Sequence, residues 1–178
     1  QKKKIMNNNE SVIEKKKNIN IYVSEGNFNS PYYNFYTDSE GNNKLLMDNN
    51  KPVLYLGNCY TFYRLNNINS HPFYVSVNGF KTKSSNVISL GGDGTHTNGI
   101  KGTESFTLSF NTLNTDNSLH YYCSLHQTMI NTFVLRDGTP RPPEPQAEVE
   151  PESEVEPEVE PEVEPEVEPE AEPEAEPE

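Results

Sequence analysis

The sequence has few of the features that mark several common protein classes. No apolar stretch in its 178 residues is long enough to cross a membrane as a helix. No segment repeats its apolar residues at the period of an amphipathic helix. Only two cysteines are present, so a hydrophobic core rather than a disulfide framework must stabilise the fold. A stretch of about 120 residues is enough to bury one such core.

Basic residues are almost absent from one part of the chain. Residues 1–140 contain 13 Lys and Arg against 10 Asp and Glu, whereas residues 141–178 contain one arginine and 17 glutamates. The net charge of −13 and the pI of about 4.7 therefore describe the C-terminal tail. We predict a basic disordered arm over residues 1–17, one domain over residues 18–138 and an acidic disordered tail over residues 139–178.

The two flanking segments are simple in composition. From Glu144 the tail repeats Pro-Glu-Val-Glu and Pro-Glu-Ala-Glu, in which proline blocks helix and the glutamates repel one another. We expect an extended spacer there. The lysines of the arm are not interleaved with aromatic residues, which favours a solvated leader over a nucleic-acid or membrane patch. We therefore expect no nucleic-acid partner.

The remaining residues alternate in short apolar and aromatic runs separated by turn-forming residues. This pattern is typical of an all-β sandwich or barrel. The glycine-rich run over residues 91–99 lacks the ending of a phosphate loop, and we interpret it as a connection between strands with an exposed His96. The strands we expect are residues 19–23, 32–36, 53–56, 60–65, 73–77, 87–90, 105–110, 121–123 and 131–135.

One set of four residues has the side chains and the spacing of a metal-binding site. Cys123, His126 and Met129 lie on a short Cys-x2-His-x2-Met segment, and His71 lies far upstream. Two imidazoles, one thiolate and a weak thioether are the ligands of a mononuclear blue-copper site. Thiolate suits Cu(I), and imidazole suits both Cu(I) and Cu(II). A distant thioether leaves the coordination geometry between those that the two oxidation states prefer. We predict that these four residues bind one copper ion per chain, cycling between Cu(II) and Cu(I).

Beyond this segment the chain resembles the cupredoxins. Residues 57–62 resemble the family's glycine-led strand, residues 102–108 its penultimate strand, residues 119–123 the strand that delivers the cysteine, and residues 129–135 the closing strand. The short ligand loop is of the amicyanin kind. The resemblance implies a Greek-key β-sandwich of about eight strands. It also implies a monomeric one-electron carrier rather than an enzyme, with a redox partner docking near His126.

Two other functions share the same ligands. One is copper uptake, storage or delivery, and the other is a structural module on a cell or virion surface with a retained or vestigial copper site. The histidine spacing argues against a copper oxidase or a nitrite reductase, because such enzymes need additional centres with His-x-His pairs and none of the four histidines is so spaced. The chain begins at Gln1, which suggests either a processed N-terminus or a fragment of a longer chain. A processed N-terminus would suit an extracytoplasmic location, whether secreted, periplasmic, lumenal or surface-associated.

The chain departs from the cupredoxin pattern at two positions. Pro72 follows His71 where the small cupredoxins often have an asparagine that braces the copper loop, so that brace is either absent or supplied by another residue. Cys59 is a second cysteine, but a strand of seven residues separates it from the copper end by about 20 Å. A disulfide requires Cα atoms within about 7 Å. We therefore expect Cys59 to be a free thiol at the opposite end of the domain. We expect His120 to lie on the opposite sheet face from Cys123.

Overall fold

The computed structural model describes residues 16–138, and almost all of their regular structure is β-strand. The predicted acidic tail and all of the predicted arm except its last two residues lie outside this range. No helix within the range is long and apolar enough to cross a membrane. The elements are β1 (Asn18–Val23), β2 (Phe35–Tyr36), β3 (Met47–Asp48), β4 (Lys51–Tyr55), β5 (Cys59–Arg64), the 3-10 turn η1 (Leu65–Asn67), β6 (Phe73–Ser76), β7 (Ile88–Gly92), β8 (Ser105–Phe110), β9 (His120–Cys123), β10 (His126–Thr132) and β11 (Val134–Arg136).

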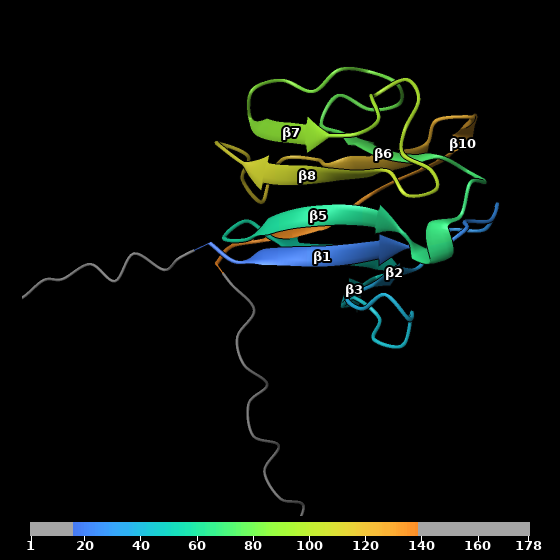
Figure 1. Ribbon diagram of the computed structural model, residues 1–178. Helices are drawn as coiled ribbons and strands as arrows, with labels where there is room; N and C mark the ends of the chain where they lie inside the picture. Colours follow the sequence, from blue (N-terminus) through green and yellow to red (C-terminus); the bar gives the residue numbers. More distant parts are fainter. Residues whose placement is uncertain (1–15, 139–178) are drawn as a thin grey trace, which may run out of the picture. The chain divides into compact units, whose positions relative to one another are not determined.

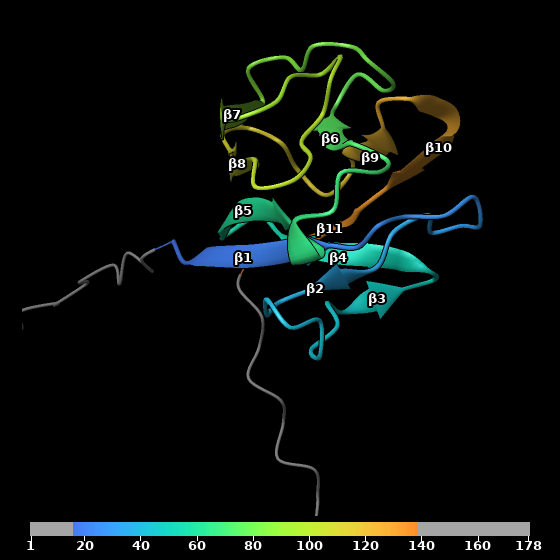
Figure 2. The same ribbon diagram turned by 45° about the vertical axis from the view of Figure 1, so that its right-hand side comes forward.

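The strands form three sheets. A five-stranded sheet has the order β2-β1-β5-β8-β7, and the two three-stranded sheets have the orders β10-β9-β6 and β11-β4-β3. Strands β1 and β5 pair in parallel, as do β4 and β11, whereas all other pairs are antiparallel. Figures 1 and 2 show the five-stranded sheet in one layer and the strands of the two smaller sheets in the other. The predicted all-β class is therefore confirmed.

Aromatic side chains join the two layers. Phe62 of β5 and Phe106 of β8 stack with ring centroids 5.1 Å apart, and both contact Phe73 of β6 across the layers at 5.5 and 6.2 Å. Tyr121 of β9 packs against Phe133 at 4.9 Å. All five side chains are at most 4% exposed. Each large aromatic removes 150–250 Å² of surface from water, so this cluster dominates the stability of the domain.

Several predicted strand boundaries were wrong. The strand expected over residues 32–36 is reduced to two residues because Tyr32 has a φ of 71°, in the left-handed region that ends an extended strand. The closing strand expected over residues 131–135 is divided at Phe133, because β10 pairs with β9 in one sheet and β11 with β4 in another. Strand β7 continues into the glycine-rich run as far as Gly92. The short strand β3 was not predicted.

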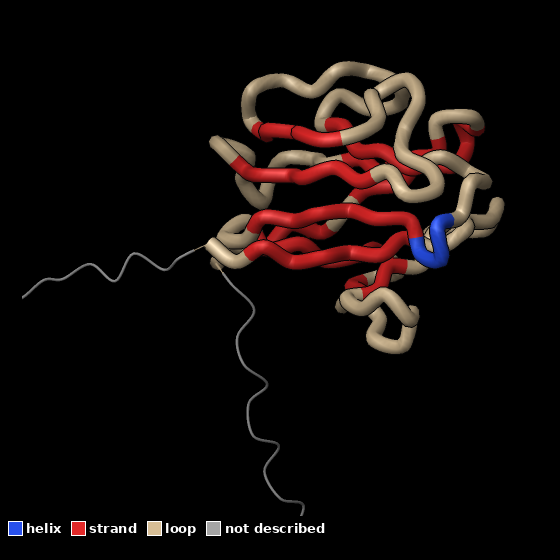
Figure 3. Tube along the Cα trace, in the orientation of Figure 1, coloured by secondary structure: helices blue, strands red, loops and turns tan. Residues whose placement is uncertain are grey.

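The predicted ligands lie at one of the two ends of the sandwich. Strands β1 and β5 run side by side from the end where the described chain begins to the end that holds η1, the single helical turn in Figure 3. The connection from η1 to β6 and the connection from β9 to β10 follow at this second end. His71, a predicted ligand, lies in the first connection, and the predicted ligands Cys123 and His126 lie on either side of the second.

Candidate metal centre

Three of the four predicted ligands come together from two connections. His71 lies just before β6, Cys123 ends β9, and His126 begins β10. Strand pairing fixes their approach, because Cys123 is opposite Phe73 of β6 on one side and opposite His126 of β10 on the other. The ligand atoms of His71, Cys123 and His126 all lie within 4.8 Å of one another.

The three atoms form a compact triangle. The two Nδ1 atoms of His71 and His126 are 3.1 Å apart, and the Cys123 Sγ lies 3.7 Å from the first and 3.4 Å from the second. A metal ion with bonds of about 2.0–2.1 Å to nitrogen and about 2.3 Å to sulfur separates such ligands by about 3.4–3.7 Å. The triangle is therefore already close to the size that a metal requires. The donor set of two imidazoles and one thiolate suits a transition metal such as copper or zinc.

Met129 is placed differently from the other three. It lies in β10 where the pairing register with β9 shifts between His126 and Ile130, and its side chain is fully buried. A Cβ atom at Gly26 would be only 3.3 Å from the Met129 methyl group and 2.8 Å from the ring of Tyr33. Gly26 has a φ of 90°, so both the backbone conformation and the lack of space favour glycine there. Axial ligation by Met129 stays a prediction.

A buried arginine supports the His71 connection. Arg64, at the end of β5, is 2% exposed. Its Nη1 donates to the carbonyl oxygens of His71 at 3.0 Å and Ile100 at 3.2 Å, and its Nη2 donates to those of Ser24 at 2.9 Å and Ser70 at 3.1 Å. One guanidinium thus joins three loops. Pro72 accepts a further hydrogen bond at its carbonyl oxygen, from the backbone N–H of Ser124 at 2.9 Å.

His71 needs this support because its backbone is strained. Its φ is 45°, a conformation that a side chain with a Cβ adopts at a cost of order 1–3 kcal/mol. Its carbonyl oxygen accepts hydrogen bonds from Arg64 and from the Tyr33 hydroxyl, which is 2.9 Å away. Such residues persist only where the surroundings over-determine them. The brace that Pro72 does not provide is therefore supplied by Arg64, Tyr33 and the Ser124 amide.

Burial sets the electrostatics of the centre. Burial, followed by the nearby His126, lowers the pKa of His71, so the imidazole is held neutral and able to accept a metal. Burial is also the largest cause that raises the pKa of Tyr33, and the proximity of Cys123 adds to it. Burial lowers the pKa of the Arg64 guanidinium from its very high usual value. The carbonyl oxygens around Arg64 favour its charged form, and its Nε is a buried donor with no partner among residues 16–138.

The outer side of the two histidines is covered by a ring. Phe28, in the loop before β2, lies edge-on to both imidazoles, with centroid distances of 5.4 Å to His71 and 5.1 Å to His126. Phe28 is nevertheless 64% exposed, and Leu125, beside His126, is 67% exposed. The only large hydrophobic side chains exposed to this degree in the described range therefore flank the candidate ligands.

The other histidines and the second cysteine lie outside the triangle. Cys59 is a free thiol, as predicted, and begins β5 at the far end of that strand from Arg64. His120 is bonded to the carbonyl oxygen of Ser76. His96 is only partly exposed, whereas a solvent-exposed residue was predicted. Arg64, Tyr33 and Phe28 contact the candidate ligands but were not predicted from the sequence. A lone arginine ending an aromatic strand was the one available signal, whereas nothing local marks Phe28.

Comparison with known proteins identifies no relative of this chain. No family model matches it, and no curated protein or solved structure does. The ligand spacing in the sequence and the geometry at the end of the sandwich are therefore the basis for any proposal about function.

Proposed function

We propose that this chain is a cupredoxin-like protein that binds one copper ion at His71, Cys123, His126 and Met129 and carries single electrons. The observation that supports this most directly is the 4.8 Å cluster of two imidazoles and one thiol. The two-layer all-β fold is compatible with the Greek-key sandwich that the resemblance implies. When bound, copper supplies a one-electron couple between Cu(II) and Cu(I).

The surrounding residues favour electron transfer because they limit movement and water. Arg64 and Tyr33 fix the His71 carbonyl, and the Leu125 N–H donates to the Cys123 sulfur at 3.4 Å. Cys123 and Met129 are fully buried. Ligands that are held in place before the metal changes charge need little rearrangement during the change.

The surface at His126 suits a partner protein. His126 is partly exposed, and the exposed Phe28 and Leu125 lie beside it. Aromatic and apolar side chains with few charges are typical of the centre of a protein interface. We therefore place the docking of a redox partner at this end of the sandwich, with His126 as the route of the electron.

A titration of the purified, reduced protein with Cu(II) tests the proposal. We expect an intense visible band from charge transfer between sulfur and copper, and a narrow parallel copper splitting in the EPR spectrum. Cys123→Ser abolishes the band, whereas the matched control Cys59→Ser keeps it. A colourless protein, or one with ordinary tetragonal copper signals, refutes the proposal. The same result in both cysteine variants refutes the ligand assignment.

A further inference from the structure

A cavity of about 310 Å³ lies away from the metal ligands, between the connection that precedes β7 and the glycine-rich connection that follows it. Its volume is within the range of small-molecule sites, which begins at about 300 Å³. Tyr74 of β6 contributes to it, as do Lys83, Ile88, Leu90 and His96. No aspartate or glutamate of residues 16–138 lines the cavity. It therefore combines a cation, hydroxyl groups and an apolar wall.

Tyr74 places an unpaired hydroxyl group in this cavity. The residue is 7% exposed, and its ring packs against Phe106 at 4.7 Å, which fixes the direction of the hydroxyl. Burial raises the pKa of Tyr74, and no other residue of the described range offsets this rise with a hydrogen bond. The group is therefore a proton donor at neutral pH. Among the described residues the Tyr74 oxygen is not one of the enclosed side-chain atoms that lack a partner, so the hydroxyl faces the open space of the cavity and can donate to a ligand acceptor there.

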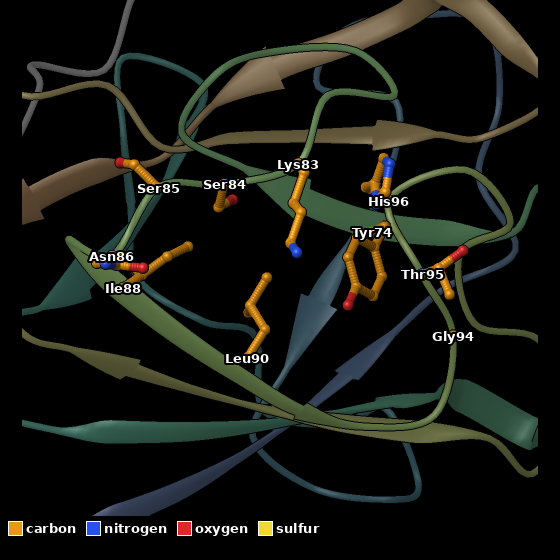
Figure 4. A pocket seen from close by; sticks show the side chains of 10 residues that line it. All are labelled: Tyr74, Lys83, Ser84, Ser85, Asn86, Ile88, Leu90, Gly94, Thr95 and His96. Carbon is orange, nitrogen blue, oxygen red and sulfur yellow. The ribbon is translucent and has the colours of Figure 1, made fainter.

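Lys83 supplies a positive charge at the same place. Figure 4 shows its amine directed into the space between Leu90 and the ring of Tyr74, with the Tyr74 hydroxyl nearby. The amine makes no ion pair with an acidic side chain of residues 16–138, where the one ion pair joins Arg136 to Asp48. An ammonium and a phenol together match the two oxygen atoms of a carboxylate.

We propose that this cavity binds a small organic carboxylate, with its oxygen atoms on Lys83 and Tyr74 and its apolar part against Ile88 and Leu90. The single lysine favours a singly charged group over a phosphate dianion, for which a second permanent cation would be expected. The half-apolar wall favours an organic acid over a bare inorganic anion. This site is independent of the proposed metal centre.

The connection over residues 93–99 separates this cavity from a second hollow and provides a control. Gly94 and Thr95 line both, but Lys81 lines only the second. Lys81→Met therefore removes a neighbouring positive charge without changing the first cavity. Tyr74→Phe keeps the ring and removes only the hydroxyl group, and Lys83→Met keeps most of the side-chain volume.

The test is a titration of the full-length, metal-free, reduced protein with benzoate, followed by amide and methyl NMR signals. We expect the signals of Ile88 and Leu90 to shift, and Lys83→Met to weaken binding about tenfold or more, as for the loss of a charge-assisted hydrogen bond. Tyr74→Phe weakens binding severalfold, whereas Lys81→Met leaves it unchanged.

Two matched probes decide the ligand class. Benzyl alcohol has the same ring without the charge, and inorganic phosphate has the charge without the ring. Equal binding of benzyl alcohol and benzoate overturns the proposal, because the carboxylate then contributes nothing. Equal dependence of phosphate binding on Lys83 and Tyr74 overturns it too, because the site then recognises any anion. An equal loss in Lys83→Met and Lys81→Met shows that only the general surface charge matters, which also refutes it.

Discussion

Replacing Arg64 by glutamine tests the most unusual feature of the metal centre. The arginine donates to carbonyl oxygens of Ser24, Ser70, His71 and Ile100 at 2.9–3.2 Å, and it is almost fully buried. Each buried carbonyl left without a donor costs about 1–3 kcal/mol. Because the glutamine amide replaces only some of these donors, we expect unfolding to become easier by about 3–5 kcal/mol. This is a large part of the 5–15 kcal/mol that stabilises a typical domain.

The same substitution removes a positive charge close to the ligands. The path from the guanidinium through the His71 carbonyl and imidazole places the charge on the order of 8–10 Å from the ligand triangle. At an effective dielectric constant of about 20, one charge at that distance contributes about 2 kcal/mol. The buried cation disfavours the oxidised, more positive state of the centre. We therefore expect the reduction potential of Arg64→Gln to fall by about 80 mV, since a tenfold change is about 59 mV for one electron.

Arg64→Lys separates charge from structure. Lysine keeps the positive charge but not the planar fork that reaches several carbonyl oxygens at once. We expect it to lose stability in urea denaturation, as glutamine does, while its potential in a redox titration stays closer to that of the unmodified protein. Equal shifts of potential in the two variants would refute the electrostatic reasoning and leave Arg64 with a structural role alone.

Other perturbations act on the same centre through different contacts. Tyr33→Phe removes one hydrogen bond to the His71 carbonyl, so it should lower stability in urea by about 1 kcal/mol and keep the visible band. Phe28→Ala should speed reaction with ferricyanide in stopped flow without changing the melting temperature, and Leu46→Ala, with a 50% exposed side chain, is its control. Met129→Leu and Met129→Gln should shift the potential in opposite directions with copper still bound, and loss of copper would contradict axial tuning. The pKa of His71 is lowered in the folded state, so the metal-free protein should lose stability as the pH falls below about 6.5, and His71→Gln should reduce that loss in urea titrations.

The sequence was sufficient for the features that depend on local spacing. Short apolar and aromatic runs separated by turn-forming residues predicted an all-β fold, because each run has the length of a strand. Cys123 and His126 lie on one short segment, so their proximity followed from the Cys-x2-His spacing, whereas the approach of His71 depends on the pairing of β6 with β9. The separation of Cys59 from Cys123 followed from the rise per residue along a strand. Each of these predictions uses the geometry of one element at a time.

Strand boundaries were less predictable because partners determine them. The division at Phe133 exists because the chain leaves the sheet of β9 and joins the sheet of β4. Short strand β3 exists because it lies beside β4. Neither feature has a local signature, since the residues on both sides of each boundary have similar β propensity. Pairing between distant segments decided them.

The brace around His71 was the least predictable feature, and it explains how Pro72 is tolerated. An asparagine after the histidine would brace the loop from within one segment. Here a left-handed His71 turns its carbonyl oxygen toward Arg64 and Tyr33, which come from separate parts of the chain. In this chain the residues that support the His71 connection are therefore distant from it in sequence, whereas Cys123 and His126 lie on one short segment. Local spacing in the sequence therefore reveals the candidate ligands but not Arg64 and Tyr33, which support the His71 connection. These two residues nevertheless determine how rigid the centre is.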